Sequence, residues 1–527
     1  MLTFPSILQR TQRNFGRSIA VRDASGELSW KVFIERIARA AALLGSLGVR
    51  RGDRFAILSR NSARSAELMH AGFWLGAVPV PLNYRLAAIE IARILDDADC
   101  GLLAIEQGFA HHLDVAPLHA WRSRALSIAP GRKSAPLPNY DTLLDATRAL
   151  DAYEPHEDDD ALILYTGSPN GRGKGVRLSH RNILASAMQL AHAMAISQSD
   201  VYLHTTQIFN SSDLKATAIT VHGGSHVYPD SVSSTGLLRT IEQHRATIVP
   251  MVRSTLIRIL EDPAFARYKL SSVRLITLGS SRIEPALIRS AIDAFPGVDI
   301  HQCYGLTETA DVLTVLDERD HRRAMMGDDA ILHSSGRALA GVDLRVVDVA
   351  GREVEAGANG EIVVRGPQIT RAYHNRPAES GESFRDGWFH TGDVGHIDAA
   401  GYVFLLEHKK DVIITNGDIV YCAEVEAVLR EYDGVQEAAV IGIADELYGE
   451  LPVAFIVPTP GRRLAEVEII QHCRGRIGGY KIPRRIVFTT NLMKNTAGRV
   501  LKPELRQRFI ARQERVSESQ HKGDALA

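Results

Sequence analysis

A glycine-rich segment carries one lysine among residues suited to phosphate binding. It reads Tyr-Thr-Gly-Ser-Pro-Asn-Gly-Arg-Gly-Lys-Gly-Val over residues 165–176. Glycines let backbone N–H groups approach an anion closely, and Lys174 adds a positive charge. An apolar run typical of a strand precedes the loop, and we expect a helix after it. Phosphate binding and an ordinary exposed loop both remain open, because Ser168 stands where the Walker pattern requires glycine.

Four further segments hold polar side chains in short, well-spaced groups. Residues 303–308 read Cys-Tyr-Gly-Leu-Thr-Glu, which combines an aromatic ring, a hydroxyl and a carboxylate. Tyr304 is suited to stack on a base, and Glu308 to bind a magnesium ion. Residues 388–393 end on Asp393, whose carboxylate is suited to accept hydrogen bonds from ribose hydroxyls. The last two segments, residues 407–418 and 495–502, contain three lysines, one arginine and two glycines.

The composition is that of an ordinary globular protein. The 527 residues are 45% hydrophobic and 23% charged, with a net charge of -1. This balance argues against a nucleic-acid binder held by bulk electrostatics and against disorder over most of the chain. Four scattered cysteines without a CxxC pair predict neither a disulfide framework nor a structural zinc site.

The sequence shows no targeting or membrane signal. No basic segment followed by an apolar run is present at the N-terminus. The longest apolar stretch, residues 71–82, is interrupted by Pro79 and Pro81 and is shorter than the ~20 residues that a membrane span needs. We therefore expect a soluble, cytoplasmic protein.

Apolar runs alternate with amphipathic stretches in the first two thirds of the chain. Helices are predicted at residues 31–47 and 182–196, the second after a capping Ser179. Buried strands are predicted at residues 55–58, 102–105, 161–166, 247–252 and 274–278. This alternation favours α/β layers with a largely parallel sheet.

The pattern changes after about residue 331. Short strands and glycine turns at residues 344–349, 362–365 and 401–405 predict an antiparallel β module with hairpins. From residue 411 onward, a helix at residues 423–431 and strands near 438–443 and 453–457 predict a compact α+β unit.

Taken in order, the five segments resemble those of the acyl-adenylate-forming superfamily, which includes acyl- and aryl-CoA ligases, peptide-synthetase adenylation domains and luciferases. The resemblance extends from residues 28–30 and 75–83 to Lys502. It implies an α/β fold: a large N-terminal AMP-binding domain, residues 1–409, with two α/β subdomains and a β-barrel. A small, mobile α+β lid would follow at residues 410–527 and turn at the hinge residue Lys410.

The resemblance also implies a reaction. Family members attack the α-phosphate of ATP with a carboxylate and form acyl-AMP; the small domain then rotates and a thiol takes the acyl group. We therefore expect an ATP-dependent acyl- or aryl-CoA ligase that uses ATP, Mg²⁺ and CoA with a small carboxylic acid, and no nucleic acid. The sequence leaves the acid and the oligomeric state open, a homodimer included.

By similarity, the site residues fall into three groups. Adenine would stack on Tyr304, ribose would meet Asp393 and His408, and Glu308 would bind magnesium. The phosphate and catalytic positions are Thr166, Gly167, Ser168, Gly171, Lys174, Thr307, Glu308 and Arg499, with Gly279 and Ser280 beside the adenine. The acyl pocket would lie near Phe209, Asn210, Gly223, Gly224 and Gly305.

Several positions depart from the family pattern. Gly167, Ser168, Pro169 and Asn170 replace the small, hydroxyl-rich core of the family's phosphate loop. His408 replaces the ribose-binding arginine. Arg499 replaces the lysine that bridges carboxylate and α-phosphate; loss of one preorganised charge typically costs ~10²–10³ in rate. Two alternatives therefore remain: a catalytically impaired or repurposed member that binds adenylates, and an adenylating enzyme that uses an amine or a carrier-protein acceptor.

Overall fold

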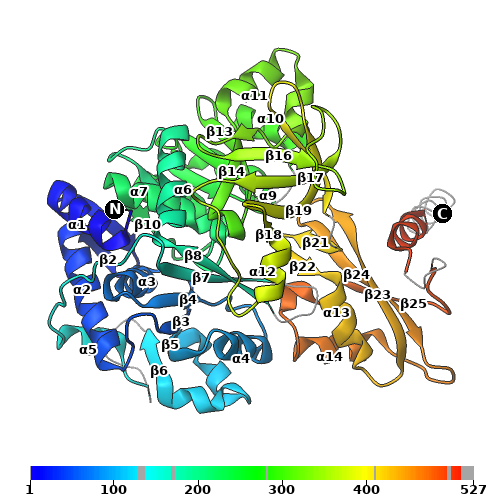
Figure 1. Cartoon of the computed structure of the whole chain (residues 1–527), viewed down its shortest axis with the longest axis horizontal. Coiled ribbons are helices and arrows are strands. Elements are labelled where there is room, and N and C mark those ends of the chain that lie inside the picture. The colour runs from blue at the N-terminus through cyan, green and yellow to red at the C-terminus, as the bar shows by residue number, and fades with distance from the viewer. Residues whose placement is uncertain are drawn as a thin grey trace. The chain divides into compact units, whose positions relative to one another are not determined.

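The computed structural model describes residues 2–128, 137–167, 173–279, 283–408, 411–494 and 500–511 (Figure 1). The chain separates into a larger unit, residues 1–84, 91–166 and 174–409, and a smaller unit, residues 85–90, 167–173 and 410–527. Five predicted site residues lie outside the described residues: Ser168, Gly171, Ser280, Lys410 and Arg499. The boundary expected after residue 409 stays a prediction, because residues 409 and 410 are also outside.

A nine-stranded sheet forms the centre of the larger unit, in the order β15-β14-β13-β12-β11-β9-β10-β1-β2. Pairing is parallel from β13 to β1 and antiparallel at both edges. The strands are β1 (Ile19–Asp23), β2 (Gly26–Ser29), β9 (Val201–Leu203), β10 (Ser225–Val227), β11 (Ile248–Met251), β12 (Leu275–Leu278), β13 (Asp299–Leu306), β14 (Asp311–Leu316) and β15 (Arg337–Ala338).

Helices cover both faces of this sheet because successive strand side chains point to opposite sides. On β11, Ile248 packs into one core and Val249 into the core of the opposite face. The first core takes the buried sides of α6 (His180–Ala193) and α7 (Ala216–His222). The second takes those of α8 (Ser234–His244), α9 (Arg253–Leu260) and α10 (Pro285–Ala294). The predicted α/β class is confirmed.

A second, fully parallel sheet has the order β4-β3-β5-β6. Its strands are β3 (Arg54–Leu58), β4 (Val78–Pro81), β5 (Cys100–Glu106) and β6 (Ala125–Ile128). The neighbouring helices are α1 (Phe4–Phe15), α2 (Trp30–Ser46), α3 (Ala63–Leu75), α4 (Ala88–Asp97) and α5 (Tyr140–Asp145). The strands predicted at residues 55–58 and 102–105 are therefore present.

The glycine-rich loop lies in a hairpin whose second strand the sequence did not predict, and the helix expected after the loop follows that strand. β7 (Asp160–Thr166) pairs antiparallel with β8 (Lys174–Ser179), and α6 begins only at His180. The alternation of buried Val176 and Leu178 with exposed Arg177 is the period-2 pattern of a strand. The side chain of Ser179 then accepts a hydrogen bond from the backbone N–H of Asn182, so the predicted N-cap is confirmed.

The antiparallel module predicted from the glycine turns is present. β17 pairs with β16 and β19, and β19 also pairs with β18 and β20. The elements are β16 (Asp343–Val347), β17 (Gly360–Arg365), α12 (Pro377–Ser383), β18 (Phe384–Arg385), β19 (Trp388–Ile397) and β20 (Val403–His408). Before them, α11 (Glu318–Met325) packs Ala324 into a core of the nine-stranded sheet.

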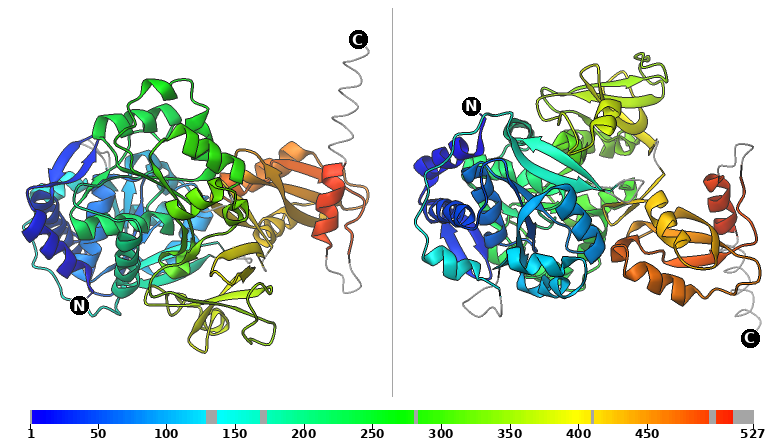
Figure 2. Two further views of the ribbon diagram at one scale, coloured as in Figure 1. Left: turned by 90° about the horizontal axis from the view of Figure 1, so that it is seen from above. Right: turned by 60° about the horizontal axis from the view of Figure 1, so that its bottom comes forward.

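The smaller unit is an α+β body with its own core. The elements from residue 411 onward, drawn in amber to red, gather in one body in both views of Figure 2. They are β21 (Val412–Thr415), β22 (Asp418–Tyr421), α13 (Cys422–Arg430), β23 (Val435–Asp445), β24 (Gly449–Pro458), α14 (Glu466–Arg474) and β25 (Arg485–Phe488). In the part of the chain that the structure describes, no helix is long and apolar enough to cross a membrane.

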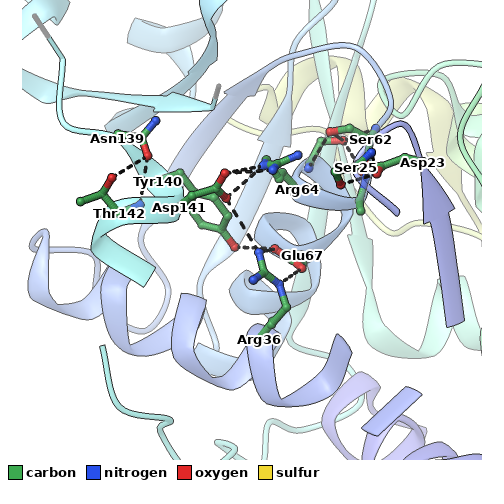
Figure 3. A network of polar contacts seen from close by, with 12 residues as sticks. Asp23, Ser25, Arg36, Ser62, Arg64, Glu67, Asn139, Tyr140, Asp141 and Thr142 are labelled. Carbon is green, nitrogen blue, oxygen red and sulfur yellow. Dashed lines mark hydrogen bonds and ion pairs between the residues drawn. The ribbon is translucent and has the colours of Figure 1, made fainter. Parts of the chain in front are cut away.

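A buried carboxylate ties three helices of the larger unit together (Figure 3). Glu67 on α3 is 0% exposed and accepts hydrogen bonds from Arg36 on α2 and from the Tyr140 hydroxyl on α5, the latter at 2.9 Å. Nearby, Arg64 pairs with Asp141 at 2.9 Å. Burial raises the pKa of Glu67, while Arg36 opposes that rise by favouring the charged form.

We expect Glu67→Ala to destabilise the larger unit by about 2–4 kcal/mol, because the buried Tyr140 hydroxyl would lose its acceptor and the partly buried Arg36 would lose its hydrogen bonds to Glu67. Glu35→Ala is the matched control: it removes the exposed Glu35–Arg39 pair on α2, which is worth less than about 0.5 kcal/mol. Urea unfolding of both variants measures the difference. Equal shifts in the two would contradict a structural role for the Glu67 network.

A neutral histidine anchors the start of α1. The backbone N–H of Phe4 donates to His180 Nδ1 at 3.3 Å, which requires that nitrogen to be unprotonated. Burial lowers the pKa of His180 to about 4, from 6.5 for the free group. Below pH 6.5 the unfolded chain therefore binds a proton that the folded chain does not. The stability is complete above about pH 6.5 and is lost as the pH falls toward 4.

Between pH 7 and pH 5, this residue should cost the protein about 2 kcal/mol of stability. In His180→Asn, an amide oxygen can still accept the bond but does not titrate. We expect this variant to recover about that amount of the acid-dependent loss in urea unfolding at the two pH values. An unchanged pH dependence would show that His180 does not titrate as its burial predicts.

Candidate active site

The turn between β13 and β14 carries the predicted adenine, phosphate and metal residues. β13 ends at Leu306, the 3₁₀ helix η5 (Thr307–Thr309) follows, and β14 returns antiparallel from Asp311. The parallel partner β12 ends one residue before Gly279, where an added Cβ would lie 3.1 Å from the Cys303 carbonyl oxygen. The predicted residues Gly279 and Tyr304 thus both lie at the carboxyl ends of the parallel strands, where such sheets commonly bind ligands.

Tyr304 and Asp393 are in direct contact. The Tyr304 hydroxyl donates to Asp393 Oδ2 at 2.5 Å, although the two residues are 89 positions apart. Asp393 lies on β19, with His408 opposite it on β20. Loss of water around the Tyr304 ring raises the pKa of its hydroxyl, and the charge of Asp393 raises it further. The hydroxyl therefore stays protonated and acts as a donor.

Lys174 and Glu308 meet at one aromatic ring. The Lys174 ammonium lies over the ring of Tyr373, with 4.7 Å between Nζ and the ring centroid. The hydroxyl of the same ring donates to Glu308 Oε1 at 2.8 Å. The predicted phosphate lysine and the predicted metal carboxylate are therefore neighbours, as their proposed roles require.

The predicted acyl residues Phe209 and Asn210 lead into the 3₁₀ helix η3 (Ser211–Lys215). The Thr307 hydroxyl donates to Ser211 Oγ at 3.3 Å, which brings this helix to the turn after β13. Phe209 packs edge-on against Tyr84, with ring centroids 5.5 Å apart, and Tyr84 stacks on Phe109 at 4.8 Å. The segment thus borders the phosphate side of the site and carries an aromatic cluster.

Gly223 and Gly224 have packing reasons of their own. Gly223 ends α7 with φ +71°, and an added Cβ would lie 2.2 Å from the Phe15 ring. The carbonyls of both glycines accept hydrogen bonds from the Trp30 indole N–H. A role in an acyl channel stays a prediction for these two positions.

The remaining predicted residues are placed as follows. Thr166 lies opposite Lys174 in the β7–β8 hairpin. Gly167 belongs to the smaller unit, where an added Cβ would lie 2.8 Å from the Tyr421 ring. Outside the described residues lie Ser168, Gly171, Ser280, Lys410 and Arg499. For His408, the structure describes the backbone and not the side chain.

Glu308 fits the expected magnesium ion. Mg²⁺ prefers carboxylate oxygens and is commonly bound through one or two carboxylates, with phosphates and water as the other ligands. Tyr373 orients the Glu308 carboxylate, and the backbone N–H of Thr370 donates to the Glu308 carbonyl at 2.9 Å. Within the described ranges, no group of three or more His, Cys, Asp or Glu residues could hold a metal ion.

Sequence reasoning missed the buried residues that support the turn. Lys215 Nζ lies 2.6 Å from Asp311 Oδ2, and both side chains are about nine-tenths buried. Burial raises the pKa of Asp311. It disfavours the Lys215 ammonium too, but the facing carboxylate outweighs this and raises the pKa of Lys215. Tyr373 was also missed, because nothing in its local sequence links it to Glu308, 65 residues away.

Two curated ligases are similar to this chain over nearly its whole length. The feruloyl-CoA synthase of an Amycolatopsis species is 33% identical over 502 residues, 95% of this chain and 98% of that protein. The indoleacetate–CoA ligase of Aromatoleum aromaticum is 33% identical over 500 residues, 94% of this chain and 95% of that protein.

Solved structures with the same architecture include two kinds of enzyme. The amide bond synthetase McbA of Marinactinospora thermotolerans matches with a TM-score of 0.85 at 27% identity, over 95% of this chain and 99% of that one. A variant of the o-succinylbenzoate CoA synthetase MenE of Bacillus subtilis matches with a TM-score of 0.84 at 27% identity, over 95% and 98%.

Two family models match the chain in sequence order. The AMP-binding enzyme model matches residues 8–374, and the model of the AMP-binding enzyme C-terminal domain matches residues 424–499. The resemblance seen in the five segments is thereby confirmed. The chain belongs to the AMP-binding enzyme family and is an adenylate-forming ligase.

Proposed function

We propose that this protein is an ATP-dependent acid–CoA ligase that activates an aromatic or acyl carboxylic acid. The observation that carries the proposal is the contact chain within the larger unit: Lys174 and Glu308 share the ring of Tyr373, and Tyr304, four residues before Glu308, holds Asp393. A nucleotide bound there would meet a cation at its phosphates and a carboxylate at its ribose. The aromatic cluster at Phe209 and the names of the curated relatives support aromatic acids as the first candidates.

The proposed reaction has two steps. A carboxylate oxygen of the acid attacks the α-phosphorus of ATP; the bond to the bridging oxygen breaks, and pyrophosphate leaves with the electron pair. The CoA thiolate then attacks the acyl carbon, forms the thioester and releases AMP. Lys174 and Thr307 would stabilise the phosphate charge, and magnesium held by Glu308 would neutralise part of it.

A second candidate uses an amine in place of the CoA thiol. The structural similarity to an amide bond synthetase favours this alternative specifically. Both candidates share the adenylation step, so the acceptor has to be identified from the products.

The turn that holds Thr307 and Glu308 depends on a close backbone contact. An added Cβ at Gly305 would lie 1.6 Å from the Asp311 carbonyl oxygen, a distance no side chain can occupy. The next residues also adopt uncommon backbone angles, with φ +47° at Ala310 and +93° at Asp311. The Lys215 ion pair and a hydrogen bond from Ser186 Oγ to the Ala310 carbonyl at 2.8 Å stabilise this conformation.

Pyrophosphate exchange into ATP, run with a panel of aromatic and aliphatic acids, tests the adenylation step. We expect exchange with at least one acid, and AMP release that depends on CoA. Release that depends on an amine and not on CoA would favour the second candidate. The absence of exchange with every acid at high enzyme concentration would contradict both.

The variant Arg499→Lys tests whether position 499 serves the adenylation step. If it does, lysine restores the compact charge of the family pattern, and we expect exchange to rise by ~10-fold or more. Lys269→Arg, an exchange of basic residues at an exposed position of the larger unit, is the control and should leave exchange unaltered. An exchange rate in Arg499→Lys equal to that of the wild type would show that residue 499 does not serve the adenylation step.

We expect Gly305→Ala to lower the exchange rate by ~10²-fold, since the segment from Tyr304 to Glu308 must shift by about 1 Å to clear the Asp311 carbonyl. Gly45→Ala is the control, because the space around Gly45 in α2 is open and alanine suits a helix. Initial rates with saturating substrates measure both variants. Wild-type exchange in Gly305→Ala would mean that the turn can move without cost.

A further inference from the structure

Tyr373 occupies a position between the two groups that are expected to bind the phosphates and the metal. Its ring is 4% exposed. One face lies beneath the Lys174 ammonium, at 4.7 Å, and the hydroxyl at its edge donates to Glu308 at 2.8 Å. A single side chain therefore contacts both groups through two different parts of its surface.

The backbone around Tyr373 is held on both sides. Tyr373 forms an antiparallel bridge with Val176 of β8, and the His374 N–H donates to the Gly175 carbonyl at 2.7 Å. On the other side, the Tyr373 N–H donates to Ser380 Oγ at 2.9 Å, and Thr370 bonds the Glu308 carbonyl. The ring thus sits on a segment joined both to the strand of Lys174 and to the turn of Glu308.

This arrangement separates a cation from a carboxylate. A lysine and a glutamate brought to the same place attract each other, and a direct ion pair would occupy the charges that the phosphates and the metal need. The aromatic face attracts the ammonium through its quadrupole. The phenol edge satisfies the carboxylate with a hydrogen bond to a charged group, which is stronger than one between neutral groups.

We propose that Tyr373 is a positioning residue that orients Glu308 for the metal and holds Lys174 apart from it. This inference rests on the proposed function for the identity of the two ligands. The two parts of the side chain have separate tasks. The hydroxyl orients the Glu308 carboxylate for the metal, and the ring holds the Lys174 ammonium for the phosphates.

Two substitutions separate these tasks. Tyr373→Phe removes the hydroxyl and keeps the ring. The Mg²⁺ concentration that gives half of the maximal increase in ATP affinity should therefore rise by about 10-fold, while the affinity for ATP in EDTA should stay unchanged. Tyr373→Leu removes the ring as well, so ATP affinity in EDTA should also fall, by about 3–10-fold. Each quantity is measured by calorimetric titration of ATP without acid, at stepped Mg²⁺ concentrations, and again by pyrophosphate exchange.

Tyr402→Phe is the matched control. Tyr402 is 2% exposed and its hydroxyl donates to Asp320 at 2.5 Å, so this variant also deletes a phenol–carboxylate bond, but one outside the candidate site. We expect it to lose stability without changing the Mg²⁺ dependence. In a Glu308→Gln background, Tyr373→Phe should produce no further shift in the Mg²⁺ requirement.

A Mg²⁺ requirement in Tyr373→Phe within twofold of the wild type, or an equal shift in Tyr402→Phe, would overturn the proposal. So would an additive shift in the Glu308→Gln background, or a wild-type protein that does not bind ATP. The two proposals can also fail separately. If the wild type binds ATP and the Tyr373 variants show the predicted shifts, but no acid supports pyrophosphate exchange, the positioning role stands and the ligase proposal fails.

Discussion

A hydrogen bond between Tyr304 and Asp393 is the contact on which the nucleotide site depends. It joins the carboxyl end of β13 in the nine-stranded sheet to β19 of the antiparallel module. Tyr304 is suited to stack on a base and Asp393 to bind a ribose, so their contact places the expected adenine and sugar positions side by side. The two segments also share an apolar cluster, in which Tyr304 and Leu306 pack against the group that contains Phe389, so the hydrogen bond orients side chains that packing brings together.

The turn that carries the predicted phosphate and metal residues combines a strained backbone with a buried ion pair. The turn after β13 approaches the Asp311 backbone so closely that residue 305 must be glycine, and Asp311 itself has a positive φ. A buried ion pair with Lys215 offsets part of that cost. Backbone strain of this kind persists only where the surroundings determine it, and it is common at functional sites. The conformation of the segment that carries Thr307 and Glu308 is therefore set by contacts within the larger unit.

Local patterns in the sequence were sufficient to predict much of the fold. The alternation of strands and helices predicted the α/β class, and the glycine turns after residue 331 predicted the antiparallel module. The pattern at residues 176–178 is also that of a strand, but the glycine-rich loop was expected to lead to the helix at residue 182 with no strand between them, so the hairpin β7–β8 was missed. Strand periodicity over three residues is a weak signal beside a loop that is followed by a helix in many nucleotide-binding folds.

The site was predictable as a set of residues but not as a set of contacts. Tyr304, Glu308, Lys174 and Asp393 came from short segments whose side-chain types suit a nucleotide. Tyr373 contacts Glu308 across 65 positions of the chain, and Lys215 pairs with Asp311 across 96, and no local pattern encodes such separations. The packing of Gly223 against Phe15 was equally invisible, because a glycine next to a pocket and a glycine under an aromatic ring look alike in sequence.

A crystal structure of the protein with bound ATP tests the central claim most directly. We expect adenine against the Tyr304 ring, ribose hydroxyls on Asp393, and phosphates between Lys174 and Thr307, all at the carboxyl end of β13. Phosphates bound away from Lys174 and Glu308, or a ribose that leaves Asp393 paired only with Tyr304, would contradict it.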